Sequence, residues 1–448
     1  MSDLALPTKI LELDANALPA MVYDLARTCL LDLLGVAAGA TQTPLARIAR
    51  EFVLSQHPGT QPLLFSGATA SSTGAALYGG WLIDALDAHD GHVLTKGHAG
   101  VAVLPGMLSL PEIRELSGRR FLGELAIGYE IAVRAGISLH NSACDYHTSG
   151  AWNCLGVTAV AARVAGLSAQ QLAEALGIAE FYGPRSQMMR CIDHPTMLKD
   201  GSGWGAMTGI CATLLAKAGF TGAPAQLLQE SDLWRDLGSH WHFLDIYFKR
   251  YPVCYWAQPA VEATLSLRAS IPHVQDIEEI RVTSFHQAIR LHTCRPRNTE
   301  EAQYSLPWAV ACAVQRGTVD QQSVVDDLEN PDVIGLAGSV RLCESTEFSE
   351  QFPAKRYATV TIRLKDGQEL ISDRFEARGT QANPIGRVEL VNKFYELAQP
   401  VLGPGADHLQ RIVNDLPEQP ITEFLAVLSQ AIPYIDRQEN SASHATPT

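Results

Sequence analysis

Histidine and carboxylate side chains are concentrated in one short segment, between residues 84 and 100. It runs from Asp84 to His92 with three aspartates and two histidines, and continues to His98. Imidazole and carboxylate groups are ligands of zinc and iron, so a metal site is one interpretation. The spacing matches no H-E-x-x-H or comparable template, and histidines at helix ends are often only caps or surface groups. We therefore predict a metal-free polar site here.

Two glycine- and serine-rich turns precede predicted helices further along the chain, at residues 144–152 and 199–205. The first holds Tyr146 beside His147, and the second begins with Lys199. Backbone N–H groups at a helix start can hold an anion, although an aromatic anchor with a capping hydroxyl is by itself enough to explain the first turn. The second turn lacks both the G-x-x-x-x-G-K-[ST] pattern and a preceding strand, so we exclude nucleotide binding. Its glycines fit close helix packing or a ligand approaching the backbone.

Cations that could hold an anion occur at a few other positions. Lys249 and Arg250 precede a proline turn, and Arg185 and Arg190 are further candidates. A solvated basic loop is an equal interpretation of the Lys249 segment taken alone. The segment around Tyr304 opens a predicted helix, where a cap and aromatic packing would explain it structurally.

Composition excludes several classes of partner. The 448 residues carry 34 basic and 48 acidic groups, a net charge of −14 that repels nucleic acid and anionic membranes. Nine scattered cysteines without a C-x-x-C pair indicate reduced thiols that serve packing. The N-terminus resembles neither a secretory signal nor a transit peptide, and no uncharged apolar run could span a bilayer. We expect a cytoplasmic protein with no nucleic-acid or membrane partner.

Helical periodicity dominates the N-terminal part of the chain. Apolar residues from Met21 to Gly39 recur at steps of three and four, which is typical of an amphipathic helix ending on glycine. The same periodicity, with much alanine and glycine for close helix contact, recurs in residues 75–88, 121–138, 156–165, 169–176, 205–218 and 259–269. We predict that residues 1–271 form a large all-helical domain.

A sheet is predicted after Ile271-Pro272, where residues 277–285 mix β-branched and charged side chains. Residues 357–364 alternate strictly and lead through Asp366-Gly367 into residues 369–373, a strong hairpin signal.

Helices at residues 305–316 and 388–398 should flank the sheet, giving a smaller α+β domain over residues 272–403. Residues 404–448 should return to the first domain as helices within 408–436, with a frayed polar tail from residue 437. The fold class predicted is therefore mainly α.

In this order, the motifs resemble the MmgE/PrpD family over about residues 20–400. The resemblance rests on the Asp-rich segment ending in Gly97-His98-Ala99-Gly100, the turn Tyr146-His147-Thr148-Ser149-Gly150, the helix start at Lys199, Ala218-Gly219-Phe220-Thr221-Gly222, Lys249-Arg250-Tyr251-Pro252-Val253-Cys254 and Gln303-Tyr304-Ser305-Leu306-Pro307. The family includes 2-methylcitrate dehydratase, cis-aconitate decarboxylase and iminodisuccinate epimerase. Membership implies a homodimer, a lid formed by the α+β domain, an active site between the two domains and no obligatory cofactor.

Three positions depart from the family pattern. Tyr146 replaces a phenylalanine beside the histidine, Gly91 stands where a threonine is usual, and Ala99 follows His98 in place of proline. These changes affect the proton-handling groups, so they argue against dehydration and decarboxylation.

The resemblance implies the family's shared chemistry, which develops negative charge beside a carboxylate and needs fixed cations. Chain length and Tyr146 favour inversion of a carbon in iminodisuccinate by two-base proton transfer. We predict Tyr146 and Lys199 as the pair, either of which could begin as the base, with His98 and His147 orienting them or the substrate. The predicted substrate-binding residues are Lys249, Arg250, Asp87, Asp90 and Tyr304.

The expected substrate is a small anionic polycarboxylate, with no metal and no cofactor. A lyase acting on a tricarboxylate is the alternative. An inactive binding protein is the least favoured, because His98, His147, Lys199 and Lys249 still occupy the cationic family positions.

Overall fold

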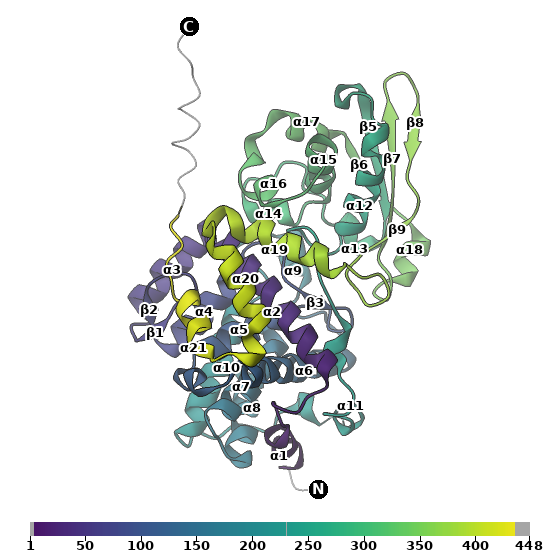
Figure 1. The fold of residues 1–448 in the computed structure, drawn as a ribbon. Helices are drawn as coiled ribbons and strands as arrows, with labels where there is room; N and C mark the ends of the chain where they lie inside the picture. Colours follow the sequence, from purple (N-terminus) through teal and green to yellow (C-terminus); the bar gives the residue numbers. More distant parts are fainter. Residues whose placement is uncertain (1–3, 230, 435–448) are drawn as a thin grey trace.

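The computed structural model describes residues 4–229 and 231–434 and has two domains (Figure 1). The larger domain is helical and the smaller one contains the main sheet, so the mainly α fold class is confirmed. The first eleven helices of the larger domain are α1 (Ala5–Glu12), α2 (Ala20–Ala40), α3 (Pro44–Gln56), α4 (Ser72–Asp84), α5 (Gly100–Leu108), α6 (Gly118–Ser142), α7 (Gly150–Val164), α8 (Ala169–Tyr182), α9 (Met189–Asp193), α10 (Ser202–Lys217) and α11 (Ser231–Arg235). In the part of the chain that is described, no helix has the length and apolarity needed to cross a membrane.

Helix α7 is the centre of the larger domain and packs against α6 on one side and α10 on another. Glycines permit the close approach: a Cβ at Gly156 would lie 2.4 Å from the carbonyl oxygen of Gly128. A Cβ at Gly209 would lie 2.6 Å from the Cβ of Val157. The alanine- and glycine-rich composition of these segments therefore serves tight helix packing, as predicted.

The smaller domain is built on five strands, which are β5 (Ile277–Ser284), β6 (Val340–Glu344), β7 (Tyr357–Leu364), β8 (Glu369–Ile371) and β9 (Phe375–Glu376). Their order is β6-β5-β7-β8, with β9 also paired to β7, and only β5 and β6 run parallel. Its helices are α12 (Gln258–Leu267), α13 (His286–Ile289), α14 (Thr299–Gln303), α15 (Leu306–Arg316), α16 (Gln321–Val325), α17 (Pro331–Ser339) and α18 (Thr346–Gln351). The predicted hairpin is present, and every second residue of β7 is buried.

Two helices pack differently from the sequence prediction. Helix α12, predicted within the helical domain, lies against β7 and α15. Helix α19 (Arg387–Leu402), predicted to flank the sheet, packs against α2 instead (Figure 1). The reason is a specific buried contact, since the ammonium group of Lys393 lies 2.6 Å from a carboxylate oxygen of Asp32.

The last helices return to the larger domain as predicted. Helices α20 (Gly405–Asp415) and α21 (Ile421–Leu428) pack against α2 and the turn at residues 111–115, respectively. The predicted frayed tail from residue 437 lies outside the described residues.

Two short strand pairs interrupt the predicted all-helical region. Strand β1 (Gln61–Pro62) pairs with β2 (Thr69–Ala70) at the edge of the larger domain. Strand β3 (Gly91–His92) pairs with β4 (Ile246–Tyr247), which brings the His- and Asp-rich segment beside Lys249. Such two-residue pairings leave no periodic signal in the sequence.

Candidate active site

A small pocket is lined by residues of both domains. Its cationic side chains are Lys96 and Lys249 from the larger domain and Arg356, which precedes β7 in the smaller one. Asp87 is its carboxylate, and tyrosines supply much of the remaining polar surface. A surplus of cations along this pocket favours the binding of carboxylate groups.

Lys249 and Asp87 form a buried ion pair in this pocket. The Lys249 ammonium lies 2.8 Å from both the Asp87 carboxylate and the Asp87 carbonyl oxygen, and its side chain is about 1% exposed. Burial alone would raise the pKa of Asp87, but the ammonium groups of Lys249 and Lys199 hold it below its ordinary value. Asp87 is therefore ionised and neutralises much of the charge of Lys249.

The pocket also concentrates backbone strain. Asp87, Lys96 and Lys199 have φ angles of 50°, 52° and 50°, in the left-handed region that side chains other than glycine rarely adopt. Such residues persist only where the surrounding structure holds them, and they cluster at functional sites.

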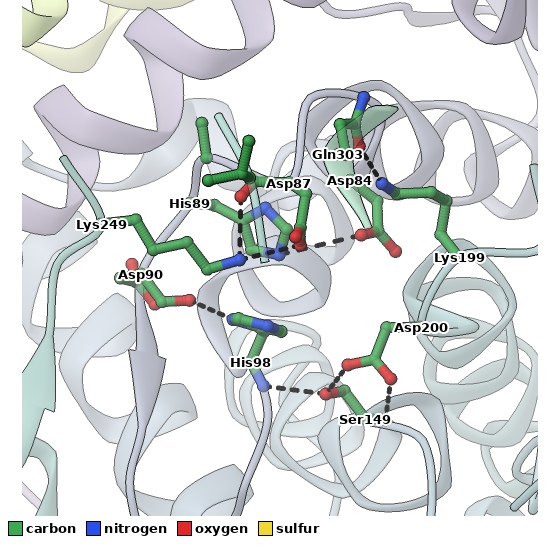
Figure 2. Close-up of polar contacts among 12 residues, drawn as sticks. Asp84, Asp87, His89, Asp90, His98, Ser149, Lys199, Asp200, Lys249 and Gln303 are labelled. Atoms are coloured by element: carbon green, nitrogen blue, oxygen red, sulfur yellow. Dashed lines mark hydrogen bonds and ion pairs between the residues drawn. The ribbon is translucent and has the colours of Figure 1, made fainter. Parts of the chain in front are cut away.

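His98 is fixed as a neutral imidazole. Its Nδ1–H donates to the carbonyl oxygen of Asp90 at 2.5 Å, since a carbonyl can only accept (Figure 2). Burial and the nearby Lys249 charge lower its pKa to about 3. The unprotonated Nε2 is consequently the ring nitrogen available for accepting a hydrogen bond or proton.

Ser149 connects the turn before α7 to the start of α10. Its hydroxyl accepts the His98 backbone N–H at 2.8 Å and donates to the Asp200 carboxylate (Figure 2). Asn153, on the next turn of α7, donates to the His98 carbonyl at 3.2 Å. Burial and the charge of Asp84 raise the pKa of Asp200 to about 8. The backbone of His98 is thus held by two segments that are about 50 residues apart in the chain, the turn at Ser149 and the helix start at Asp200.

Lys199 approaches the cluster from the side opposite to Lys249 (Figure 2). Its ammonium donates to the side-chain oxygen of Gln303 and lies 5.1 Å from the centre of the Tyr304 ring, which lines the pocket. Gln303 is oriented by donating to the Ala85 carbonyl at 2.8 Å. Lys199 itself lines a second, larger pocket of about 400 Å³.

Asp84 and His89 lie between the two lysines (Figure 2). Neither Asp84 oxygen has a hydrogen-bond partner among the described residues, and one lies 3.8 Å from His89 Nε2. Burial raises the pKa of Asp84 to about 6, although Lys199 opposes the shift. Burial also lowers the pKa of His89 well below its ordinary value, so this imidazole is neutral.

Tyr146 lines the pocket through a partly buried side chain. Its hydroxyl donates to the carbonyl oxygen of Lys96, whose ammonium lies 5.4 Å from the Tyr146 ring centre. Burial and the charge of Asp200 raise its pKa well above the ordinary value. Tyr146 is therefore a protonated phenol near neutral pH.

The structure thus brings together five of the predicted residues, Asp87, His98, Tyr146, Lys249 and Tyr304, around one pocket, with Lys199 beside it.

Besides Lys199, three predicted residues do not line this pocket. The His147 ring hydrogen-bonds the Asp145 carbonyl at 3.0 Å in its own turn. The Arg250 guanidinium is held by Glu396, with two contacts of 2.8 Å, and by Glu389. The Asp90 carboxylate accepts the Tyr129 hydroxyl behind His98, so Asp90 acts on the site through its backbone carbonyl. The further candidate Arg190 lines the second pocket with Lys199.

Sequence reasoning assigned no role to Lys96, Arg356 or Tyr247, all of which line the pocket. Lys96 belongs to the polar segment and could have been considered, whereas Arg356 is remote in sequence and belongs to no motif. Tyr247 explains the unusual glycine: a Cβ at Gly91 would lie 2.5 Å from the Tyr247 hydroxyl. The space of a side chain at residue 91 is thus occupied by Tyr247.

One group in the described part of the chain could ligate a metal ion. Donor atoms of Asp87, His89 and His98 lie within 4.8 Å of one another, and all three residues are buried. Both ring nitrogens of His89 lack a partner among the described residues. However, Lys249 already occupies one oxygen of Asp87, and a neighbouring ammonium opposes a second cation. A metal-free site therefore stays our prediction.

Comparison with known proteins gives a consistent family assignment. Residues 5–243 match the MmgE/PrpD N-terminal domain, and residues 251–419 match the MmgE/PrpD C-terminal domain. A cis-aconitate decarboxylase of Aspergillus terreus is 23% identical over 445 residues, covering 86% of this chain and 87% of the relative. A cis-aconitate decarboxylase-like protein, oryM, of Aspergillus oryzae is 22% identical over 470 residues, covering 94% and 95%.

Proposed function

Because the chain belongs to the MmgE/PrpD family, whose members are enzymes, we propose that it catalyses proton transfer at a carbon beside a carboxylate in a small polycarboxylate. The observation that carries this proposal is the pocket between the domains. It combines the cations Lys96, Lys249 and Arg356 with the protonated phenol of Tyr146. Fixed cations stabilise the negative charge that develops when such a carbon loses a proton or CO₂.

The protonation states assign a direction to the transfer. Tyr146 and Tyr304 both have pKa values raised well above the ordinary value, mainly by burial, so both can donate a proton and neither begins as a base. His98 is neutral, and its Nε2 carries no proton. The Lys199 ammonium lies over the Tyr304 ring, which lines the pocket. In our proposal Lys199 acts in its neutral amine form, takes the substrate proton and becomes an ammonium, while His98 hydrogen-bonds the substrate through Nε2 and Tyr146 donates its own hydroxyl proton to the other face.

Within this reaction class, we propose epimerisation of iminodisuccinate as the specific activity. Inversion needs a donor and an acceptor on opposite faces of one carbon. Tyr146 lines the pocket from the turn before α7, and Lys199 lies beside it from the turn before α10, over the Tyr304 ring, which supports such an arrangement. His147, the neighbour of Tyr146, does not line the pocket, so Tyr146 is the group of its turn that meets the substrate.

A lyase is the second candidate, and the relatives favour it, since both are named as decarboxylases or decarboxylase-like. The same cations would stabilise the carbanion left after loss of CO₂, and Tyr146 could then protonate it. Relatives of 22–23% identity support the shared chemistry more strongly than the identity of the leaving group.

Incubation in D₂O distinguishes the candidates. With one stereoisomer of iminodisuccinate, an epimerase incorporates deuterium at the α-carbon and yields the other isomers without releasing water or CO₂. Tyr146→Phe and Lys199→Ala should each abolish inversion, and we expect exchange on a single face to survive in one of them. Tyr434→Phe is the matched control, because Tyr434 is 56% exposed and does not line the pocket. Release of CO₂ from cis-aconitate without α-exchange in iminodisuccinate would establish the lyase instead.

We also propose a homodimer. Several large apolar side chains are exposed on α8, α10 and the segment between them, namely Phe181, Tyr182, Leu198, Trp204, Leu214 and Leu215. Helices α8 and α10 pack against each other. Several exposed apolar side chains on neighbouring helices are typical of a protein–protein contact, and the family resemblance makes a second copy the expected partner. Light scattering at micromolar concentration should give about twice the mass of the 48.5 kDa chain.

A further inference from the structure

Arg356 is a buried cation without an acidic partner. Its side chain is 4% exposed, and no carboxylate among the described residues lies within ion-pair distance. The buried cations Lys249, Lys393 and Arg134 are each paired with a carboxylate, those of Asp87, Asp32 and Glu130, respectively. A buried charge that lacks a partner is costly, so its retention needs an explanation.

One edge of the Arg356 guanidinium is not used by the protein. Nη1 donates to the Pro353 carbonyl at 3.0 Å, and the plane packs near the rings of Tyr255 and Phe352, at 5.2 and 5.4 Å. Nε has no hydrogen-bond partner among the described residues, and none is recorded for Nη2. The Nε–Nη2 edge is one that can pair with a carboxylate through two parallel hydrogen bonds.

Lys96 reaches the same pocket from the larger domain. Its backbone is held at a φ of 52°, and its ammonium forms no ion pair with the described residues. Burial and the charge of Arg356 lower its pKa. Two like charges therefore face one pocket, without a carboxylate of the protein between them.

We propose that Arg356 and Lys96 jointly bind one carboxylate group of the substrate. The proposal rests on the proposed function, because it takes this pocket to be where the polycarboxylate binds. The same pocket is also lined by Lys249, whose charge is already balanced by Asp87, and by His98. In our proposal one carboxylate of the substrate binds Arg356 and Lys96, and the reacting carbon lies near His98 and Tyr146.

The arrangement gives these two residues a role in selectivity and in domain closure. A monocarboxylate has no further carboxylate for the rest of the pocket, so the pair should select substrates with two or more carboxylates. Because Arg356 and Lys96 belong to different domains, a carboxylate bound by both joins the domains and excludes water from the reacting carbon.

Titration calorimetry of the full chain with tricarballylate, a non-reacting tricarboxylate, tests the proposal. Arg356→Gln and Lys96→Gln should each weaken binding by about tenfold or more, equal to about 1.4 kcal/mol. If both residues hold the same carboxylate, the double variant should lose clearly less than the product of the two single losses. Arg356→Lys should retain part of the affinity, since it keeps the charge but not the bidentate edge.

Arg374→Gln is the matched control. Arg374 belongs to the same domain as Arg356, lies over the Tyr357 ring and pairs with Glu347 outside the pocket. The tricarballylate affinity of the Arg374→Gln variant should therefore stay within about twofold of wild type. Folding is checked by thermal melting, and Lys96→Gln supplies an independent measurement should Arg356→Gln fail to fold.

The joint site would be refuted if folded Arg356→Gln bound tricarballylate as tightly as wild type. It would also be refuted if the affinity loss of the double variant equalled the product of the two single losses. The variants could lose affinity as expected while the wild-type protein shows neither α-exchange nor CO₂ release. That result would support the carboxylate site and refute the proposed reaction. A wild-type protein that does not bind tricarballylate would refute both.

Discussion

At the scale of single residues, the chemistry of the site depends on backbone contacts as much as on side-chain identity. His98 is an acceptor at Nε2 because the Asp90 carbonyl binds its Nδ1–H. Asp87, Lys96 and Lys199 reach their positions through left-handed backbone conformations. A glycine at residue 91 leaves room for the Tyr247 hydroxyl. Each of these features can be tested by one substitution.

Gly91→Ala should impair both activity and stability. The new Cβ would lie 2.5 Å from the Tyr247 hydroxyl and 2.9 Å from His98 Nδ1, so it must displace one of them. Overpacking of this kind costs roughly 1–3 kcal/mol, and displacement of His98 should lower kcat more than about tenfold. Turnover and urea denaturation measure the two effects. Gly335→Ala, where a Cβ meets nothing within 4 Å, is the control and should behave as wild type.

Arg250→Gln should change KM by less than about twofold, because its guanidinium is engaged by Glu396 and Glu389 and not by the pocket. This differs from the role expected from sequence. Stability should fall by about 1 kcal/mol or less, as for a partly exposed ion pair. Steady-state kinetics decide the matter: a large increase in KM at unchanged kcat would restore Arg250 as a carboxylate ligand.

Chelation should leave the activity unchanged. Asp87, His89 and His98 are close enough to share an ion, but the Asp87 carboxylate is engaged by Lys249. Dialysis against EDTA followed by turnover measurement tests this expectation. Activity that disappears and returns with one divalent metal would identify this trio as a metal site.

At the scale of elements, helix α19 holds the site together from outside the pocket. Lys393 on α19 lies 2.6 Å from Asp32 on α2 and also donates to the Ala88 carbonyl, next to Asp87. One lysine thus ties two helices to the polar segment that carries the pocket residues.

Lys393→Met should destabilise the protein by about 3–5 kcal/mol, since it leaves the buried Asp32 carboxylate unpaired. The double variant Lys393→Met, Asp32→Leu should recover part of this loss, because no buried charge remains. Arg47→Met is the control, as Arg47 and Glu51 form an exposed pair, 58% and 64% exposed. Urea denaturation provides the values, and an equal loss in the double variant would show that packing, and not charge, dominates.

At the scale of the whole molecule, burying so many ionisable groups makes stability depend on pH. The folded-state pKa of Asp200 is raised to about 8 and that of Asp90 to about 7, both chiefly by burial. In the unfolded chain these carboxyl groups titrate near pH 4. Between these limits the folded state binds more protons, so their contribution to stability falls as pH rises. The histidines His92 and His98, with pKa values lowered to about 3, act in the opposite sense below about pH 6.5.

Stability should therefore decline between about pH 6.5 and 8.5, where the carboxyl groups titrate and the histidines do not. Asp200→Asn mimics the protonated carboxyl group and should reduce this decline by on the order of 1–2 kcal/mol. Its side-chain amide can still bond to Ser149, so the fold should be retained. Denaturation midpoints across the pH range measure the slope, and identical slopes in the variant and wild type would place the Asp200 pKa outside this window.

Local elements of the fold were predictable because their signals are local. Apolar spacing identified the helix found at Ala20–Ala40, and strict alternation with an Asp-Gly turn identified the strand Tyr357–Leu364. The packing of α19 was not predictable, since an amphipathic face indicates that something covers it but not which element does. The short pairing of β3 with β4 also left no signal in the sequence, because it depends on contact between two segments about 150 residues apart in the chain.

The sequence by itself determined the family, the mainly α class and the residue types capable of the chemistry, because ordered motifs and periodicity are properties of the chain. Only the tertiary structure decided which of them meet. It placed Tyr146 at the pocket but not His147, paired Lys249 with Asp87, and engaged Arg250 elsewhere. It also brought Arg356 from the smaller domain to Lys96 of the larger one. The physical reason is that charge, burial and distance act between residues far apart in the chain, and these quantities exist only once the chain is folded.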